Sequence, residues 1–191
     1  MSVFEHLMTL GSFILALGLA TILMFLATLA HKRKQAKLSA PHLLWMAAIF
    51  VNQINFWLGS YALHDATHSS YISIAFVILF PVLLYLQSAL VVADNGGPLD
   101  MPAHHIANKH YYIGLIVAAS ALDALYFLYL AAANPQLDLA LFLVADAILI
   151  ATGLLAIFSN HALTQVAVPG LHLMIRLFGF VLSAYPLIAG V

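Results

Sequence analysis

Apolar side chains fill six long runs of the chain, and polar residues are concentrated in the short breaks between them. The runs cover about residues 7–30, 41–63, 71–93, 110–133, 137–159 and 166–190. Each run is long enough to cross the roughly 30 Å hydrocarbon core of a bilayer as a helix, which rises about 1.5 Å per residue. The pattern therefore predicts an all-α polytopic membrane protein, a bundle of about six transmembrane helices in a single domain.

The composition agrees with a lipid environment. Of the 191 residues 64% are hydrophobic and only 7% are charged, whereas a soluble domain carries about a quarter charged residues. A net charge of −1 with six Lys and Arg residues argues against nucleic acid as a partner. The chain contains no cysteine, which excludes disulfides, thiolate metal sites and iron–sulfur clusters. The expected partner is the lipid bilayer.

The basic residues predict an orientation in the membrane. Four of the six lie in the first break, at Lys32, Arg33, Lys34 and Lys37, and Lys109 lies at the end of the third break. Loops rich in Lys and Arg remain on the cytoplasmic side. We therefore expect both termini on the opposite, periplasmic side of a bacterial inner membrane.

Three ionisable residues fall at membrane depth, namely Asp123, Asp146 and Arg176 in the last three predicted spans. Burying such a group costs at least about 2.5 kcal/mol, so these groups normally face the interior of a bundle and have partners. From the helical rise we place all three roughly 15–20 Å from the cytoplasmic edge. The sequence therefore predicts a buried charged site, with Arg176 in contact with at least one carboxylate, directly or through water, and Asp146 favoured. A structural ion pair with one protonated Asp remains the alternative reading.

Uncharged polar residues add a second feature at mid-depth. The second predicted span carries Asn52, Gln53 and Asn55, and the third carries Gln87. At 100° per residue the three on one helix form a broad polar face. This face is either hydrogen-bonding contact between helices or the lining of a cavity shared with the charged residues.

Ten histidines raise the question of a metal or haem centre. His64 and His68 have the four-residue spacing of two ligands on one helical face, and with Asp65 they are candidates for a surface zinc or copper site. A haem held by two of His172, His42 and His110 would require matched depth on different helices. His104, His105 and His110 form a second group, which the predicted topology places on the other side of the membrane from His64 and His68. The sequence assigns no cofactor and no catalytic motif, which argues against an enzyme.

Four segments resemble a group of small, uncharacterised bacterial multi-span membrane proteins: HLLW at 42–45, QINFW at 53–57, PVLLYL at 81–86 and HIANKHYY at 105–112. The resemblance covers about a third of the chain. It implies a bacterial inner-membrane location and brings no activity or binding residues.

Together these features favour translocation or sensing of a small ion or solute through a buried polar site. Two alternatives remain open. The chain could be a non-catalytic subunit or assembly partner of a larger membrane complex, or it could be a histidine-dependent metal or haem enzyme. Its protein partner in the membrane could be a second copy of the chain or another membrane protein.

Overall fold

Six α-helices account for nearly all of the part of the chain that the computed structural model describes, which is residues 3–62, 71–92, 99–134 and 139–189. Side chains are described at 6–60, 71–92, 99–134 and 139–181. The helices are α1 (Val3–His31), α2 (Ala40–Ala62), α3 (Tyr71–Val91), α4 (Met101–Ala133), α5 (Ala140–Phe158) and α6 (Ala162–Ala189). Each is long and apolar enough to cross a membrane. The predicted all-α bundle of six membrane-spanning helices is therefore confirmed.

The start of α4 differs from the sequence prediction, which placed it at residue 110. The helix begins at Met101, with a proline in its first turn and the Asp100 side chain accepting a hydrogen bond from the Ala103 N–H at 3.1 Å. Asp is a favoured N-cap residue and Pro a favoured residue at the first helical position. The polar segment between residues 102 and 109 is therefore helical, so Lys109 belongs to a helix and not to a loop.

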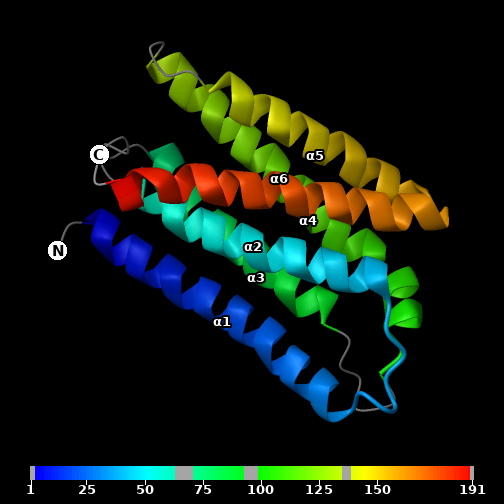
Figure 1. Ribbon diagram of the computed structural model, residues 1–191. Helices are drawn as coiled ribbons and strands as arrows, with labels where there is room; N and C mark the ends of the chain where they lie inside the picture. Colours follow the sequence, from blue (N-terminus) through cyan, green and yellow to red (C-terminus); the bar gives the residue numbers. More distant parts are fainter. Residues whose placement is uncertain (1–2, 63–70, 93–98, 135–138, 190–191) are drawn as a thin grey trace.

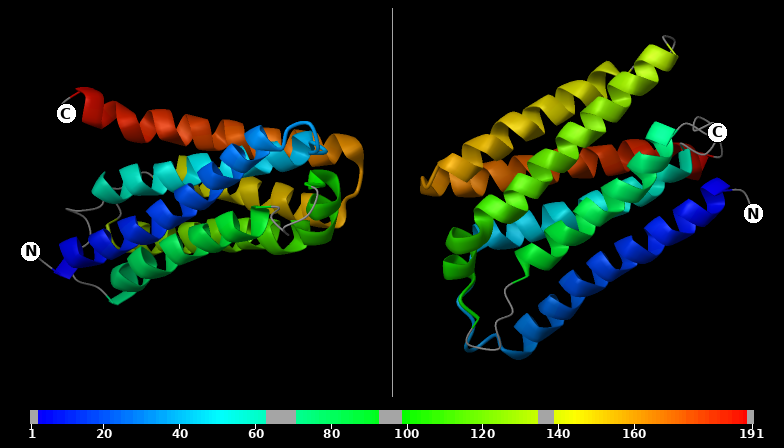
Figure 2. Two further views of the ribbon diagram at one scale, coloured as in Figure 1. Left: turned by 90° about the horizontal axis from the view of Figure 1, so that it is seen from below. Right: turned by 180° about the vertical axis from the view of Figure 1, so that it is seen from behind.

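The helices are packed side by side, with α1 and α5 on opposite sides of the bundle (Figures 1 and 2). The most extensive contacts join α2 to α6, α4 to α5, α1 to α3, and α3 to α4. Helix α2 also contacts α1, α3 and α4, and is therefore the central element of the fold. Because the number of helices is even, α1 begins and α6 ends at the same end of the bundle (Figure 1).

Two apolar clusters form the core. One surrounds Trp45 and Tyr112, both fully buried, and the other surrounds Phe80 and Tyr126. Large apolar side chains such as Phe13, Met24 and Phe158 are instead exposed on the outer surface of the bundle. An outer surface of this kind is expected where lipid replaces water as the solvent.

The segment after α1 is joined to the start of α4. The Lys37 N–H donates to the Leu99 carbonyl at 2.8 Å, and the Met101 N–H donates to the Lys37 carbonyl at 3.1 Å. The Lys37 ammonium also pairs with the Asp100 carboxylate at 2.6 Å. We call this end of the molecule, which carries Lys32, Arg33, Lys34 and Lys37, the basic end.

Candidate functional site

The three ionisable residues at membrane depth come from three neighbouring helices: Asp123 from α4, Asp146 from α5 and Arg176 from α6. Arg176 donates a hydrogen bond to the Ser120 hydroxyl at 3.0 Å, one turn before Asp123 on α4. Asp146 is only 3% exposed, and its Oδ2 atom has no hydrogen-bond partner. The Asn55 amide donates to the Arg176 backbone carbonyl at 2.6 Å, which fixes α6 against α2 at this level.

The electrostatics of this charged cluster involve all three residues. The Arg176 guanidinium interacts with both carboxylates, and the carboxylates also interact with each other. Among the described side chains, however, Lys37–Asp100 is the ion pair whose nitrogen–oxygen distance is below 4.0 Å. Neither Asp123 nor Asp146 lies within 4.0 Å of the Arg176 guanidinium. A direct salt bridge between Arg176 and either carboxylate is therefore not formed among the described side chains, and the guanidinium bonds to the Ser120 hydroxyl instead. A contact through water, which the sequence analysis also allowed, stays a prediction. With both carboxylates ionised, the cluster carries one negative charge in excess of the guanidinium.

A histidine that the sequence analysis considered only for haem belongs to the same region. His172 lies one helical turn before Arg176 on α6 and interacts with it electrostatically. Its Nε2 atom is 3.0 Å from the Thr152 hydroxyl on α5. Because that hydroxyl donates its single proton to the Ile148 carbonyl at 2.7 Å, Nε2 is the donor to Thr152. The four-residue spacing of His172 and Arg176 is the sequence signal that could have joined them.

The polar residues at mid-depth point to different helices. Gln53 donates to the Ser88 hydroxyl on α3, and Gln87 donates to the Leu115 carbonyl on α4 at 3.1 Å. Asn55 is directed towards α6, as described above, and Asn52 is buried at 5% exposure. Each of these hydrogen bonds joins a different pair of helices. Among these polar residues, Asn55 is the one with a described hydrogen bond to a residue of the charged cluster.

The three haem candidates are also separated. His42 is fully buried, with its ring centroid 5.4 Å from that of His104 and 6.2 Å from that of His105. His172 has its ring against Trp45 at 4.8 Å, and His110 is exposed on the surface of α4. No ring contact or hydrogen bond joins any two of His42, His110 and His172 within the described chain. His64, Asp65 and His68 lie outside the described residues.

Near the basic end, His42 of α2 lies against His104 and His105 of α4, whereas the sequence analysis grouped His104 and His105 with His110. His105 accepts from the Tyr112 hydroxyl, and its Nε2–H donates to the Gln165 amide oxygen at 2.8 Å. The direction is fixed because the Gln165 nitrogen donates to the Ala156 and Ser159 carbonyls. Both ring nitrogens of His105 are thus engaged, whereas neither nitrogen of His42 makes a hydrogen bond within 3.5 Å, although the backbone of Val91 and Met101 lies near the ring. Within the described residues no group of three His, Asp or Glu side chains could hold a metal ion.

Lys109 is buried at 2% exposure beside this group. Its ammonium donates to the Ala156 carbonyl at 3.2 Å, the Ser159 carbonyl at 2.6 Å and the Asn160 side-chain oxygen at 2.8 Å. These acceptors lie at the carboxyl end of α5, where backbone carbonyls lack partners within the helix and the helix dipole is negative. Lys109 therefore caps α5.

Within the described residues, the charged cluster gathers ionisable side chains at the depth that the sequence places inside the membrane. It combines a carboxylate with an unpartnered oxygen, a second carboxylate, a guanidinium and an imidazole on three adjacent helices. Comparison with known proteins finds no matching family model, curated protein or solved structure.

Proposed function

We propose that the protein translocates a small ion across the membrane through the charged cluster, and that the ion is a proton. The observation that carries the proposal is the buried Asp146 carboxylate, whose Oδ2 atom has no hydrogen-bond partner and which lies farther than 4.0 Å from the Arg176 guanidinium. Buried polar groups in membrane bundles are normally satisfied, and exceptions are associated with ion pathways.

The charge balance supports a cation as the ligand. A net negative charge at membrane depth is costly, and binding one positive charge removes it. A metal ion would need several oxygen ligands close to the positive guanidinium of Arg176. A proton needs a single carboxylate oxygen, which Asp146 offers. Asp123 of α4 and His172 of α6 both interact electrostatically with Arg176, and we propose them as further groups that exchange a proton with the cluster.

We further propose that the protein lies in a bacterial inner membrane with the basic end in the cytoplasm. Arg33, Lys34 and Lys37 are exposed there, and the positive-inside rule assigns such a segment to the cytoplasm. The start of α1 and the end of α6 would then both face the periplasm. The resemblance of four segments to small bacterial membrane proteins supports the same location.

The test is proton flux into vesicles. The purified full chain is reconstituted into liposomes that contain a pH-sensitive dye, and a potassium diffusion potential drives uptake. We expect uptake by the wild type and its loss in Asp146→Asn. The matched control is Asp100→Asn, which removes a carboxylate at the basic end and should retain the flux.

Three results would contradict the proposal. Uptake no faster than in protein-free liposomes would exclude translocation of protons. Equal uptake by the wild type and Asp146→Asn would exclude this site. A flux of sodium without a flux of protons would show that the ion is not a proton.

A further inference from the structure

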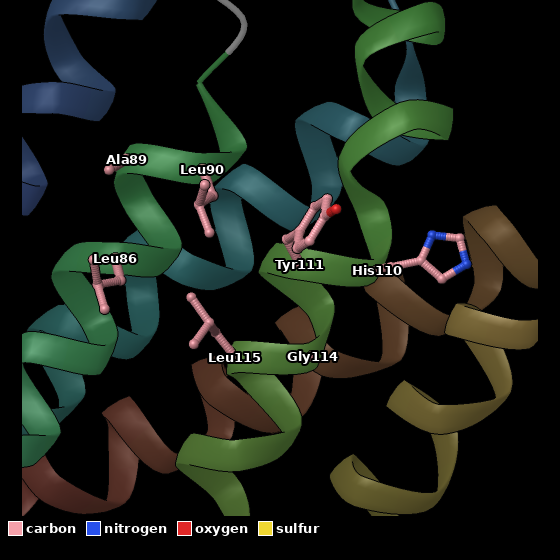
Figure 3. A pocket seen from close by; sticks show the side chains of 7 residues that line it. All are labelled: Leu86, Ala89, Leu90, His110, Tyr111, Gly114 and Leu115. Carbon is pink, nitrogen blue, oxygen red and sulfur yellow. The ribbon is translucent and has the colours of Figure 1, made fainter.

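A groove runs between α3 and α4 on the outer surface of the bundle (Figure 3). It has a volume of about 460 Å³, and Leu86 and Leu90 of α3 line one wall. Tyr111, Gly114 and Leu115 of α4 line the other. The groove lies in the half of the two helices nearest the basic end, because α3 ends and α4 begins there.

Gly114 borders the groove and has no side chain to fill it. A Cβ atom added to Gly114 would meet no other atom within 4 Å, so the position opens onto free space and not onto a neighbouring helix. Leu86 and Leu90 are 39% and 37% exposed, and Tyr111 is 65% exposed. On a membrane-spanning surface these apolar walls face lipid chains.

The basic end carries four cations and lies at the end of the bundle where α3 ends and α4 begins (Figure 1). Of the four basic residues at the basic end, Lys37 is paired with Asp100. Lys32, Arg33 and Lys34 form no ion pair with the acidic residues that the structure describes. The backbone bonds between Lys37 and residues 99 and 101 hold this segment against the start of α4. A basic cluster next to a membrane helix attracts anionic lipid headgroups, by about 1 kcal/mol per residue.

From the apolar groove and the positive charge at the same end of the bundle we propose that the α3–α4 groove binds an anionic phospholipid of the surrounding bilayer. One acyl chain would lie in the groove against Gly114 and Leu115. The phosphate headgroup would lie at the basic end, near Arg33 and Lys34, and the exposed Tyr111 would border the chain near the membrane interface, where tyrosine is favoured. This proposal is independent of proton translocation.

The test counts bound lipid on the full chain by native mass spectrometry. The protein is purified in detergent, stripped of lipid and titrated with phosphatidylglycerol or phosphatidylcholine of the same chain length. We expect saturable binding of phosphatidylglycerol and at least fivefold weaker binding of phosphatidylcholine. Gly114→Phe should abolish the saturable site because its ring fills the groove. Gly170→Phe is the matched control, since a Cβ at Gly170 on α6 also meets free space.

A second pair of variants keeps the proposal testable if Gly114→Phe does not fold, as judged by circular dichroism and gel filtration. Arg33→Gln and Lys34→Gln should each weaken phosphatidylglycerol binding about fivefold and leave phosphatidylcholine binding unchanged. Unchanged phosphatidylglycerol binding in these variants would overturn the proposed headgroup site. Equal binding of the two lipids by the wild type, or wild-type binding by folded Gly114→Phe, would overturn the proposal as a whole.

Discussion

Replacing Lys109 by methionine probes how the carboxyl end of α5 is held. The change removes three hydrogen bonds made by a buried ammonium. Bonds to charged groups are each worth about 1.5–3 kcal/mol. Two of the acceptors, the Ala156 and Ser159 carbonyls, still accept from Gln165 at 2.8 and 2.5 Å, and the third acceptor is on the exposed Asn160. We therefore expect Lys109→Met to lower the free energy of unfolding by only about 2 kcal/mol, well below the sum of three bonds.

The double variant gives the sharper test. Gln165→Leu alone leaves the His105 Nε2–H without its acceptor, which costs about 1–3 kcal/mol. When Lys109 and Gln165 are both replaced, the Ala156 and Ser159 carbonyls lose every side-chain donor that the structure gives them. The loss in the double variant should therefore exceed the sum of the single losses by about 1–2 kcal/mol.

The assay is equilibrium unfolding in mixed detergent micelles, followed by far-ultraviolet circular dichroism, on the wild type, both single variants and the double variant. Losses that add within about 0.5 kcal/mol would show that the two side chains do not share these carbonyls. A Lys109→Met variant as stable as the wild type would show that the lysine does not cap α5.

Other regions of the molecule give three further predictions. Arg176→Met should lower the free energy of unfolding by about 3 kcal/mol because two carboxylates lose their counter-charge, and adding Asp146→Asn should recover part of that loss in the same unfolding assay. The hydrogen bond from Lys37 lowers the pKa of the Asp100 carboxyl from its usual value of 3.8. The stability that the Lys37–Asp100 pair contributes is thus present above about pH 4 and is lost as the pH falls further. When the unfolding midpoint is measured against pH, Asp100→Asn should lack this acid-dependent loss. A reporter fused to the carboxyl terminus should be active only in the periplasm, and activity only in the cytoplasm would reverse the orientation.

The six helices could be predicted from the sequence because the thickness of the bilayer sets the length of each apolar run. The start of α4 could not be read from hydropathy, since the segment around His105 and Lys109 is polar. The cap at Asp100 and the proline that follows were the available signal. A helix needs satisfied backbone groups at its ends, and an apolar run alone does not mark where it begins.

The charged cluster could be predicted only in part. Because exposing an ionisable side chain to lipid is costly, the sequence alone predicts that Asp123, Asp146 and Arg176 face the interior of the bundle. The rotation of α6 about its axis is set by packing, and it brings Arg176 to Ser120 and not into direct contact with a carboxylate. The histidines show the same limit, because His105 and His110 are close in sequence but about 140° apart around the helix. His105 is buried for that reason, while His110 is exposed.

The central claim is that the charged cluster takes up a proton on Asp146, and infrared difference spectroscopy tests it most directly. Spectra of the protein in liposomes are recorded as the pH is lowered, and the C=O stretch of a protonated carboxyl group is followed. We predict a band that appears on acidification, is absent from Asp146→Asn and is retained in Asp100→Asn. The same band in the wild type and Asp146→Asn, or its loss only in Asp100→Asn, would contradict the account.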